Sequence, residues 1–441
     1  MKKQIILLIA TLAACAVTFS GQRGQDRSLT ANPIRSVNQV EQPAANHIIA
    51  IVGATLIDGR GGPAIPDAVV IIRAERIAAV GRRAAITIPA DAEVFDAKGL
   101  TLLPGLIDAH FHIDGDDPLP ALYLSHGITS LRDPGQWIEA YDAARKAPAP
   151  VPRLFLCGPH LDSPPPAYPS DSYIVRDPEE TRLAVNRFAD DGASAIKVYY
   201  RLPLALIRVA IETAHARGIP VTSHLEIVDA SDVIRAGIDG VEHATSFGTA
   251  LLPLRDAEKY RQAVLADNNA RREGRYQVWN SINLDTPRAR ALVKLIVDRG
   301  TFVSPTLAVF ERQPGDKDTT DVHVHAFKQM EAFVRMAKSA GAKVVVGSHS
   351  DVPHAKRGWA YQRELELLVE AGLTPMEALV AGTMENARFF RIADRLGSVE
   401  PGKLADLVLV EGDPLQNISK MRLVKRVMLN GRWVKAESES K

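Results

Sequence analysis

The best starting point for predicting the fold is the segment Leu103-Pro-Gly-Leu-Ile-Asp-Ala-His-Phe-His112. It is an apolar stretch, typical of a buried strand, that ends in two histidines. We predict one strand over residues 102–112. Alternate residues of a strand point to the same face, so His110 and His112 aim both imidazoles into one cavity. A metal ion in that cavity could bind both rings.

After this segment the sequence repeats a pattern of strand, loop and amphipathic helix. Helices are expected between most strands, for example over residues 204–217, 288–299 and 325–339. Eight such units predict an α/β fold, a (β/α)8 TIM barrel over residues 102–395. A doubly wound sheet is the alternative, but eight units strain that topology. The expected strands are residues 102–112, 127–133, 153–160, 195–200, 220–226, 240–245, 302–307 and 343–351.

Short β-rich runs separated by turn signals flank this central region on both sides. They fill residues 47–101 and return over residues 396–436, with an Asn430-Gly431 turn near the end. The termini of a domain often lie close together. The two flanks are therefore expected to combine into one small β-sandwich.

The N-terminus has the composition of an export signal over residues 1–20, with two lysines before a short apolar stretch. Leu12-Ala13-Ala14-Cys15 resembles a bacterial lipobox, in which a lipidated cysteine anchors the mature chain to a membrane. An ordinary signal cut after Ser20 is the alternative. Both interpretations predict an exported protein, either a periplasmic or outer-membrane lipoprotein or a secreted protein. Residues 21–46 are polar and aperiodic, and we expect a linker there.

Composition excludes some classes of function. The 441 residues are 46% hydrophobic with a formal net charge of +1, which fits a large soluble enzyme or binding protein and offers no basic surface for nucleic acid. With Cys15 in the signal, Cys157 has no partner within the chain. The fold therefore cannot depend on disulfides.

Two further histidines lie where a barrel places its catalytic groups. His224 ends the fifth expected strand and His243 ends the sixth. Active sites of TIM barrels lie at the C-terminal ends of the strands. Together with His110 and His112, these residues predict a metal site of the zinc type.

A second His-x-His pair is expected to have no such role. His323 and His325 begin an expected helix, where residues two positions apart do not share a face. We therefore predict that both are exposed to solvent.

Lys197 is the other unusual residue of the predicted barrel. It lies within Ala193-Ser-Ala-Ile-Lys-Val-Tyr-Tyr200, which is short and rich in β-branched residues and is expected to be a buried strand. Burying an isolated ammonium group is costly unless its charge is neutralised, paired or chemically changed. A chemical role is therefore expected for Lys197.

These features together resemble the amidohydrolase superfamily of metal-dependent hydrolases. The resemblance rests on His-x-His in the first strand, a lysine in the fourth, a histidine in the fifth and sixth, and an acid near the eighth. It includes residues 103–112 and Gly397-Ser-Val-Glu-Pro-Gly-Lys-Leu-Ala-Asp-Leu-Val408, and it covers nearly all of the mature chain. Within the superfamily the chain is most similar to the imidazolonepropionase-like and Xaa-Pro-dipeptidase-like branch.

The resemblance implies a site for two divalent metal ions, with zinc favoured by the histidines. His110 and His112 would bind the more buried ion, and His224 and His243 the more exposed one. Lys197, carboxylated by carbon dioxide to a carbamate, would bridge the two. A metal-bridging hydroxide would then cleave an amide-type C–N bond in a dipeptide, an acyl amino acid or a cyclic amide.

Two other functions fit the same residues. A mononuclear deaminase or ring hydrolase would use this fold with one metal ion and an unmodified Lys197. A catalytically silent, lipid-anchored binding protein would keep the scaffold without the reaction. Each acts on a small molecule, and the sequence sets neither its identity nor the oligomeric state.

The eighth expected strand departs from the family's pattern. Members usually carry Gly-Thr-Asp or Gly-Ser-Asp there, whereas this chain has Val346-Gly-Ser-His-Ser-Asp351, which puts His349 in the aspartate position. Asp351 lies two residues further on and can serve as catalytic base if the strand end bulges. We favour Asp351 slightly over His349.

Substrate contacts are expected from His160, Tyr199 and Arg201, near the ends of the third and fourth strands. The charged, helix-forming segment 252–275 interrupts the regular spacing between the sixth and seventh strands. It is either a lid over the barrel mouth or a solvated helical insertion.

Overall fold

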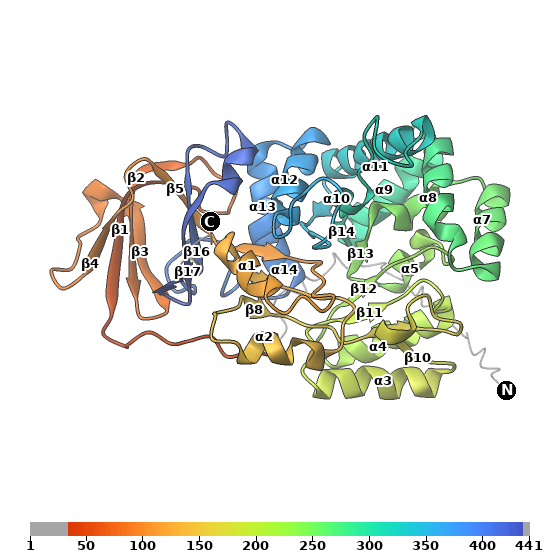
Figure 1. The fold of residues 1–441 in the computed structure, drawn as a ribbon, viewed down its shortest axis with the longest axis horizontal. Helices are drawn as coiled ribbons and strands as arrows, with labels where there is room; N and C mark the ends of the chain where they lie inside the picture. The colour runs from red at the N-terminus through yellow and green to blue at the C-terminus, as the bar shows by residue number, and fades with distance from the viewer. Residues whose placement is uncertain (1–33, 435–441) are drawn as a thin grey trace, which may run out of the picture.

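The computed structural model of the protein describes residues 34–434, which form two regions joined side by side (Figure 1). One region is a sheet built from the two ends of the described chain, at the left of the figure. The other contains short parallel strands surrounded by helices. The fold is therefore α/β, as predicted.

The terminal region is one continuous hydrogen-bonded sheet of eight strands, in the order β18-β17-β16-β5-β1-β2-β3, with β4 paired to β1. Strands β5 and β16 pair antiparallel and join the N-terminal half to the C-terminal half. Both faces are buried, because Ile49 and Ile51 of β1 pack in one apolar cluster and Ile48 and Ala50 in another. The strands are β1 (Ile48–Leu56), β2 (Ile65–Arg73), β3 (Arg76–Arg82), β4 (Glu93–Asp96), β5 (Leu100–Pro104), β16 (Leu407–Glu411), β17 (Val424–Leu429) and β18 (Arg432–Trp433).

Residues 103–112 belong to both regions, so the prediction of one strand over residues 102–112 was wrong. Strand β5 ends at Pro104 in the terminal sheet, and β6 (Leu106–Asp108) starts the parallel region. Gly105 lies between them, where a Cβ atom would be 2.2 Å from Thr129 Oγ1. Only glycine allows the chain to pass this close to the next strand.

The parallel region contains two sheets, in the orders β6-β7-β8 and β10-β9-β11-β12-β13-β14-β15. Backbone hydrogen bonds link them at both sides, from Ala109 N–H to Val346 C=O at 2.9 Å and from Ser194 N–H to Leu156 C=O at 2.7 Å. The ladders are shorter than predicted, and the chain leaves several of them before the residues that face the cavity, although Lys197 lies within β11. The strands are β7 (Ile128–Leu131), β8 (Arg153–Leu154), β9 (His160–Asp162), β10 (Ser172–Ile174), β11 (Ile196–Val198), β12 (Val221–Ser223), β13 (Gly240–Glu242), β14 (Phe302–Ser304) and β15 (Lys343–Val344).

The predicted helices are confirmed with small changes at their ends. Helix α9, for example, starts at Pro287 after the capping residue Thr286 and ends at Arg299, before the C-cap residue Gly300, whose φ is 65°. The helices are α1 (Leu119–Ser125), α2 (Asp142–Lys146), α3 (Pro178–Asp190), α4 (Leu204–Ala216), α5 (Ala230–Ala236), α6 (Gly248–Leu251), α7 (Leu254–Ala266), α8 (Ala270–Ser281), α9 (Pro287–Arg299), α10 (Leu307–Phe310), α11 (Asp321–Ser339), α12 (Ala360–Glu370), α13 (Pro375–Val380) and α14 (Asn386–Phe389).

The end of the expected linker is part of the folded structure. Ile34 is buried, and Val37 N–H donates to Leu154 C=O at 2.8 Å. Residues 34–46 therefore belong to the fold, whereas the expected export signal and Cys15 lie outside the described residues. Within residues 34–434, no helix is both long and apolar enough to cross a membrane.

The pair His323 and His325 was predicted to be exposed, and this is right only for His325. His323 is buried, closes a capping box with Thr320 at the start of α11, and packs 4.8 Å from the ring of Tyr276. A histidine in the first turn can bond to the orphan backbone groups there, which the spacing alone did not reveal.

Substituting Asp406→Ala is expected to destabilise the protein by about 3 kcal/mol, because it leaves a largely buried guanidinium without its partner. Arg153 of β8 donates to both oxygens of Asp406 at 2.7 and 3.1 Å, and so ties the parallel region to the terminal sheet. Urea unfolding measures the change. The control Glu411→Ala removes an exposed ion pair with Lys425 in the same sheet and should cost clearly less stability than Asp406→Ala, because solvent screens an exposed pair. Equal losses in the two variants would contradict the prediction.

Candidate metal centre

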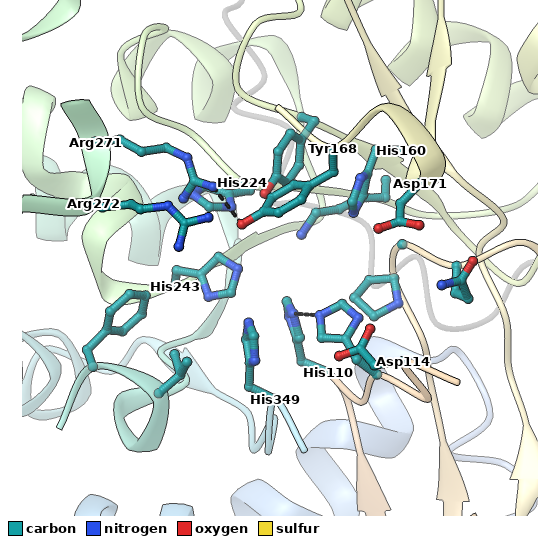
Figure 2. A pocket seen from close by; sticks show the side chains of 18 of the residues that line it. His110, Asp114, His160, Tyr168, Asp171, His224, His243, Arg271, Arg272 and His349 are labelled. Carbon is teal, nitrogen blue, oxygen red and sulfur yellow. Dashed lines mark hydrogen bonds between the residues drawn. The ribbon is translucent and has the colours of Figure 1, made fainter. Parts of the chain in front are cut away.

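Six of the seven residues predicted to bind metal or transfer protons line one cavity of about 300 Å³ at the C-terminal ends of the parallel strands (Figure 2). The chain turns out of the sheet after each strand, which leaves these side chains facing a shared space. They are His110 and His112 after β6, Lys197 in β11, His224 after β12, His243 after β13 and His349 after β15.

His110 and His112 present their Nε2 atoms to each other at 3.0 Å, so two lone pairs converge on one point. Behind the rings, Nδ1 of His110 lies 3.0 Å from Oε2 of Glu242, and Nδ1 of His112 lies 3.4 Å from Oδ1 of Asp133. A carboxylate at Nδ1 holds the proton there and leaves Nε2 free for an ion.

The other two predicted ligands are oriented in the same manner. Nε2 of His224 lies 3.1 Å from Oε1 of Glu226, and its Nδ1 is buried without a hydrogen-bond partner among the described residues. Nδ1 of His243 lies 2.7 Å from Thr306 Oγ1, which leaves its Nε2 free. The two rings are 4.5 Å apart between centroids. Each histidine thus has one nitrogen held and one available.

These residues fit a divalent metal ion. Two groups of residues could each hold an ion, because the potential ligand atoms within each group lie within 4.8 Å of one another. One group is His110, His112 and His349, and the other is His110, Glu242 and His243. Burial lowers the pKa of His224 to about 4 and that of His243 well below its usual value. Both rings are therefore neutral at pH 7, and neutral imidazole is the form that binds metal.

Lys197 is buried, with 1% of its surface exposed, and its Nζ forms an ion pair with Oε2 of Glu242. Glu242 is fully buried, and its Oε1 accepts a hydrogen bond from Thr222 Oγ1 at 2.7 Å. Burial lowers the pKa of Lys197 well below its usual value. Sequence reasoning missed Glu242, because adjacent residues of a regular strand point to opposite faces. The left-handed backbone of His243, with a φ of 65°, ends that alternation and lets both side chains approach His110.

The end of the eighth strand does bulge, but it brings His349 to the cavity and not Asp351. His349 and Ser350 both have left-handed backbone, with φ values of 61° and 64°, and His349 N–H donates to His110 C=O at 2.6 Å. The His349 ring lies 4.8 Å from that of His112. Asp351 is exposed and does not line the cavity, so its position does not support the predicted role as base.

Two of the three residues predicted to contact substrate line the cavity. His160 and Tyr199 stack with their ring centroids 4.2 Å apart. Arg201 does not line it, and instead donates to Asn268 Oδ1 at 2.6 Å and to backbone oxygens at the end of α7. This position does not support its predicted role as a substrate contact, because its guanidinium holds the segment 252–275.

That segment is the insertion formed by α7 and α8, and it contributes to the cavity. Arg271, Arg272 and Arg275 of α8 line the same space as the histidines. Figure 2 shows Arg271 and Arg272 beside His224 and above His243. The insertion is therefore a cover of the site and not only a solvated helix pair.

Parallel strands that end in converging, carboxylate-backed histidines define a metal-dependent hydrolase. The comparisons agree with this class, since the chain belongs to the Amidohydrolase family, whose pattern matches residues 101–434. It is thus an enzyme that acts on C–N bonds.

An uncharacterised protein of Mycobacterium tuberculosis is 25% identical over 371 residues, 77% of this chain and 86% of that protein. An adenine deaminase of Lactiplantibacillus plantarum is 25% identical over 367 residues, 78% of this chain and 52% of that protein. A crystal structure of a Xaa-Pro dipeptidase with bound methionine superimposes with a TM-score of 0.69 at 23% identity, covering 88% of this chain and 99% of that one.

Substituting Glu226→Gln is expected to weaken zinc binding about tenfold or more, because the neutral amide no longer orients His224 or raises its basicity. Competition with a chromophoric chelator measures the affinity. Glu258→Gln, an exposed change on the neighbouring helix α7, is the control and should leave zinc binding unchanged. If the two variants bind zinc alike, Glu226 has no part in holding the site.

Proposed function

We propose that the protein is a binuclear, metal-dependent hydrolase of an amide-type C–N bond. The observation that carries the proposal is the buried Lys197 in a cavity with four histidines whose free nitrogens face inward. His110 and His112 would hold one ion, and His224 and His243 the other. Lys197, carboxylated on Nζ, would bridge them in place of its ion pair with Glu242.

The chain's own residues would position the substrate and move the proton. Two divalent ions, zinc by ligand type, would supply Lewis acidity and an acidified water when bound. His349, whose pKa is lowered by burial, is neutral and able to accept the proton of the attacking water. It would pass that proton to the leaving nitrogen as the C–N bond breaks, so that water adds OH to the acyl carbon and H to the amine.

The same proposal extends to the scaffold. We propose that the parallel strands form a closed (β/α)8 barrel, supported by the backbone hydrogen bonds that link both sides of the two parallel sheets. The terminal sheet would complete the molecule as a sandwich, supported by apolar clusters on both of its faces. The metal ligands would then lie at the C-terminal mouth of the barrel.

A single-metal deaminase is the second candidate function. Two observations favour it: the similarity to an adenine deaminase, and the direct contact of an unmodified Lys197 with Glu242. In that enzyme the lysine would balance the charge of the glutamate and would never be carboxylated.

Substituting Lys197→Ala separates the two candidates. In the binuclear enzyme, bound zinc should fall from about two ions per chain to about one and amide hydrolysis should be lost, because the bridging ligand is removed. Elemental analysis gives the zinc content, and carbon-13 NMR of wild-type protein in labelled bicarbonate should show a carbamate signal that the variant lacks. One zinc ion in both proteins, with no carbamate signal, would instead support the deaminase.

Substituting His349→Ala is expected to lower kcat about a hundredfold or more, because the proton acceptor is lost. Asp351→Asn is the matched control, two residues away and exposed, and should keep kcat within about twofold. Zinc content is measured on both proteins, so that loss of an ion is distinguished from loss of the base. The opposite result, with only Asp351→Asn inactive, would restore Asp351 as the base.

A further inference from the structure

Glu226 connects a predicted metal ligand to the insertion that covers the cavity. Its Oε1 lies 3.1 Å from Nε2 of His224, and its Oε2 accepts a hydrogen bond from the Tyr260 hydroxyl of α7. Only 2% of Glu226 is exposed. One buried carboxylate is therefore shared between the ring that would hold an ion and a helix that supplies no metal ligand.

Tyr260 is held in this position by the second helix of the insertion. A Cβ atom at Gly274 of α8 would lie 2.8 Å from Cε2 of Tyr260, so α8 leaves room for the ring because residue 274 is a glycine. The ring also packs against the apolar cluster that contains Tyr199 and Val264. Because the ring is packed on α8 and on this cluster, its hydroxyl stays directed at Glu226.

Little apolar packing holds α7 in its place. Of its 13 residues only Ala257 and Val264 are buried, and the helix lies at the outer edge of the parallel region (Figure 1). Polar contacts tie it to the loop after β12, where Arg261 donates from Nε to Ile227 C=O at 2.7 Å and lies 3.7 Å from Asp229. A helix with so few buried apolar residues depends on such contacts to stay over the cavity.

The two hydrogen bonds on Glu226 support each other. His224 donates from Nε2 and so presents Nδ1, which has no hydrogen-bond partner among the described residues, for an ion. When Nδ1 binds an ion, the N–H at Nε2 becomes a stronger donor and holds the carboxylate more firmly. A carboxylate held in this way keeps its second oxygen in place for the Tyr260 hydroxyl. Loss of that hydroxyl would leave a buried carboxylate oxygen without its donor, which is unfavourable.

We infer that Tyr260 is a positioning residue for His224, acting through Glu226, and that ion binding at His224 and the closed position of the α7–α8 insertion stabilise each other. The closed position is the one in which Tyr260 bonds to Glu226. The inference rests on the metal centre of the proposed function and adds a coupling between that centre and its cover. Such coupling is reciprocal, so closure raises metal affinity by the same factor by which bound metal favours closure.

Substituting Tyr260→Phe in the full chain tests the coupling on the side of the metal. The affinity for one zinc ion should fall about fivefold or more, because the carboxylate that orients His224 loses a donor. Competition with a chromophoric chelator measures the affinity. Tyr276→Phe is the matched control, since it removes a hydroxyl of α8 that donates to Phe310 C=O at 3.3 Å, and it should bind zinc like the wild type. Circular dichroism of the zinc-free proteins checks that both variants are folded.

A double substitution shows whether Tyr260 acts through Glu226. Because Glu226→Gln already removes the charge that orients His224, adding Tyr260→Phe should weaken zinc binding by less than about twofold further. If Tyr260→Phe has the same effect with and without Glu226→Gln, the tyrosine does not act through the glutamate and the inference is overturned.

Amide hydrogen exchange measures the coupling on the side of the insertion. Zinc should slow exchange in peptides from α7 of the wild-type protein, because bound metal favours the closed position. The slowing should be about fivefold smaller or more in Tyr260→Phe and unchanged in Tyr276→Phe. The inference is overturned if wild-type protein binds zinc with no change in α7, or if Tyr260→Phe keeps both the zinc affinity and the slowing.

These measurements use no substrate, so they separate the inference from the proposed reaction. If zinc slows exchange in α7 through Tyr260 but the wild-type protein cleaves none of a panel of dipeptides, acyl amino acids and cyclic amides, the hydrolytic proposal fails and the coupling stands. If the wild-type protein cleaves an amide while Tyr260→Phe binds zinc and exchanges like it, the coupling fails and the hydrolytic proposal stands.

Discussion

The burial of Lys197 against Glu242 is the constraint on which the rest of the site depends. Neither group reaches solvent, and each would be strongly unfavourable alone in the protein interior. Their pairing solves this problem, and Glu242 at the same time lies 3.0 Å from Nδ1 of His110. One carboxylate therefore balances the lysine charge and orients the first histidine, so that strands β6, β11 and β13 must keep their register for the site to exist.

The other histidines predicted to bind metal are also held by a polar side chain at one ring nitrogen. Asp133 lies behind His112, Glu226 behind His224 and Thr306 behind His243, each on the ring nitrogen that faces away from the cavity. Asp133 and Thr306 follow strands β7 and β14, which neighbour the strands of their histidines, whereas Glu226 lies two residues after His224 in the same loop. The fold thus supplies oriented, neutral imidazoles at the cost of burying several carboxylates, and an ion bound at the free nitrogens would offset that negative charge.

The sequence predicted the residues that periodicity and strand ends can identify. His110, His112, Lys197, His224 and His243 were placed correctly around one cavity, because the residues at the ends of parallel strands converge whatever their exact length. The features that it missed depend on backbone geometry or on distant partners. The break at Gly105 follows from contact with Thr129, and the turn at His349 and Ser350 needs left-handed backbone that non-glycine residues seldom adopt. Arg201 is charged and follows a predicted strand end, which made it a candidate substrate contact. Only its bond to Asn268 shows that it holds the insertion.

The strand ends carry the predicted metal ligands, and the α7–α8 insertion covers the cavity. Arg201 does not face the cavity, but it holds this insertion in place. The predicted metal ligands lie at strand ends, where the sheet hydrogen bonds hold the backbone. Substitutions at these positions are therefore expected to disturb the metal site. Helices α7 and α8 contribute no ligand atom to the predicted metal set, so their cavity-facing residues are free to differ while the centre stays intact. Tyr200 and Arg201 follow soon after Lys197 in the chain, and their bonds to Asn268 hold the segment between α7 and α8 relative to the cavity. The strand that carries Lys197 thus leads directly into the loop that holds the α7–α8 insertion over the cavity.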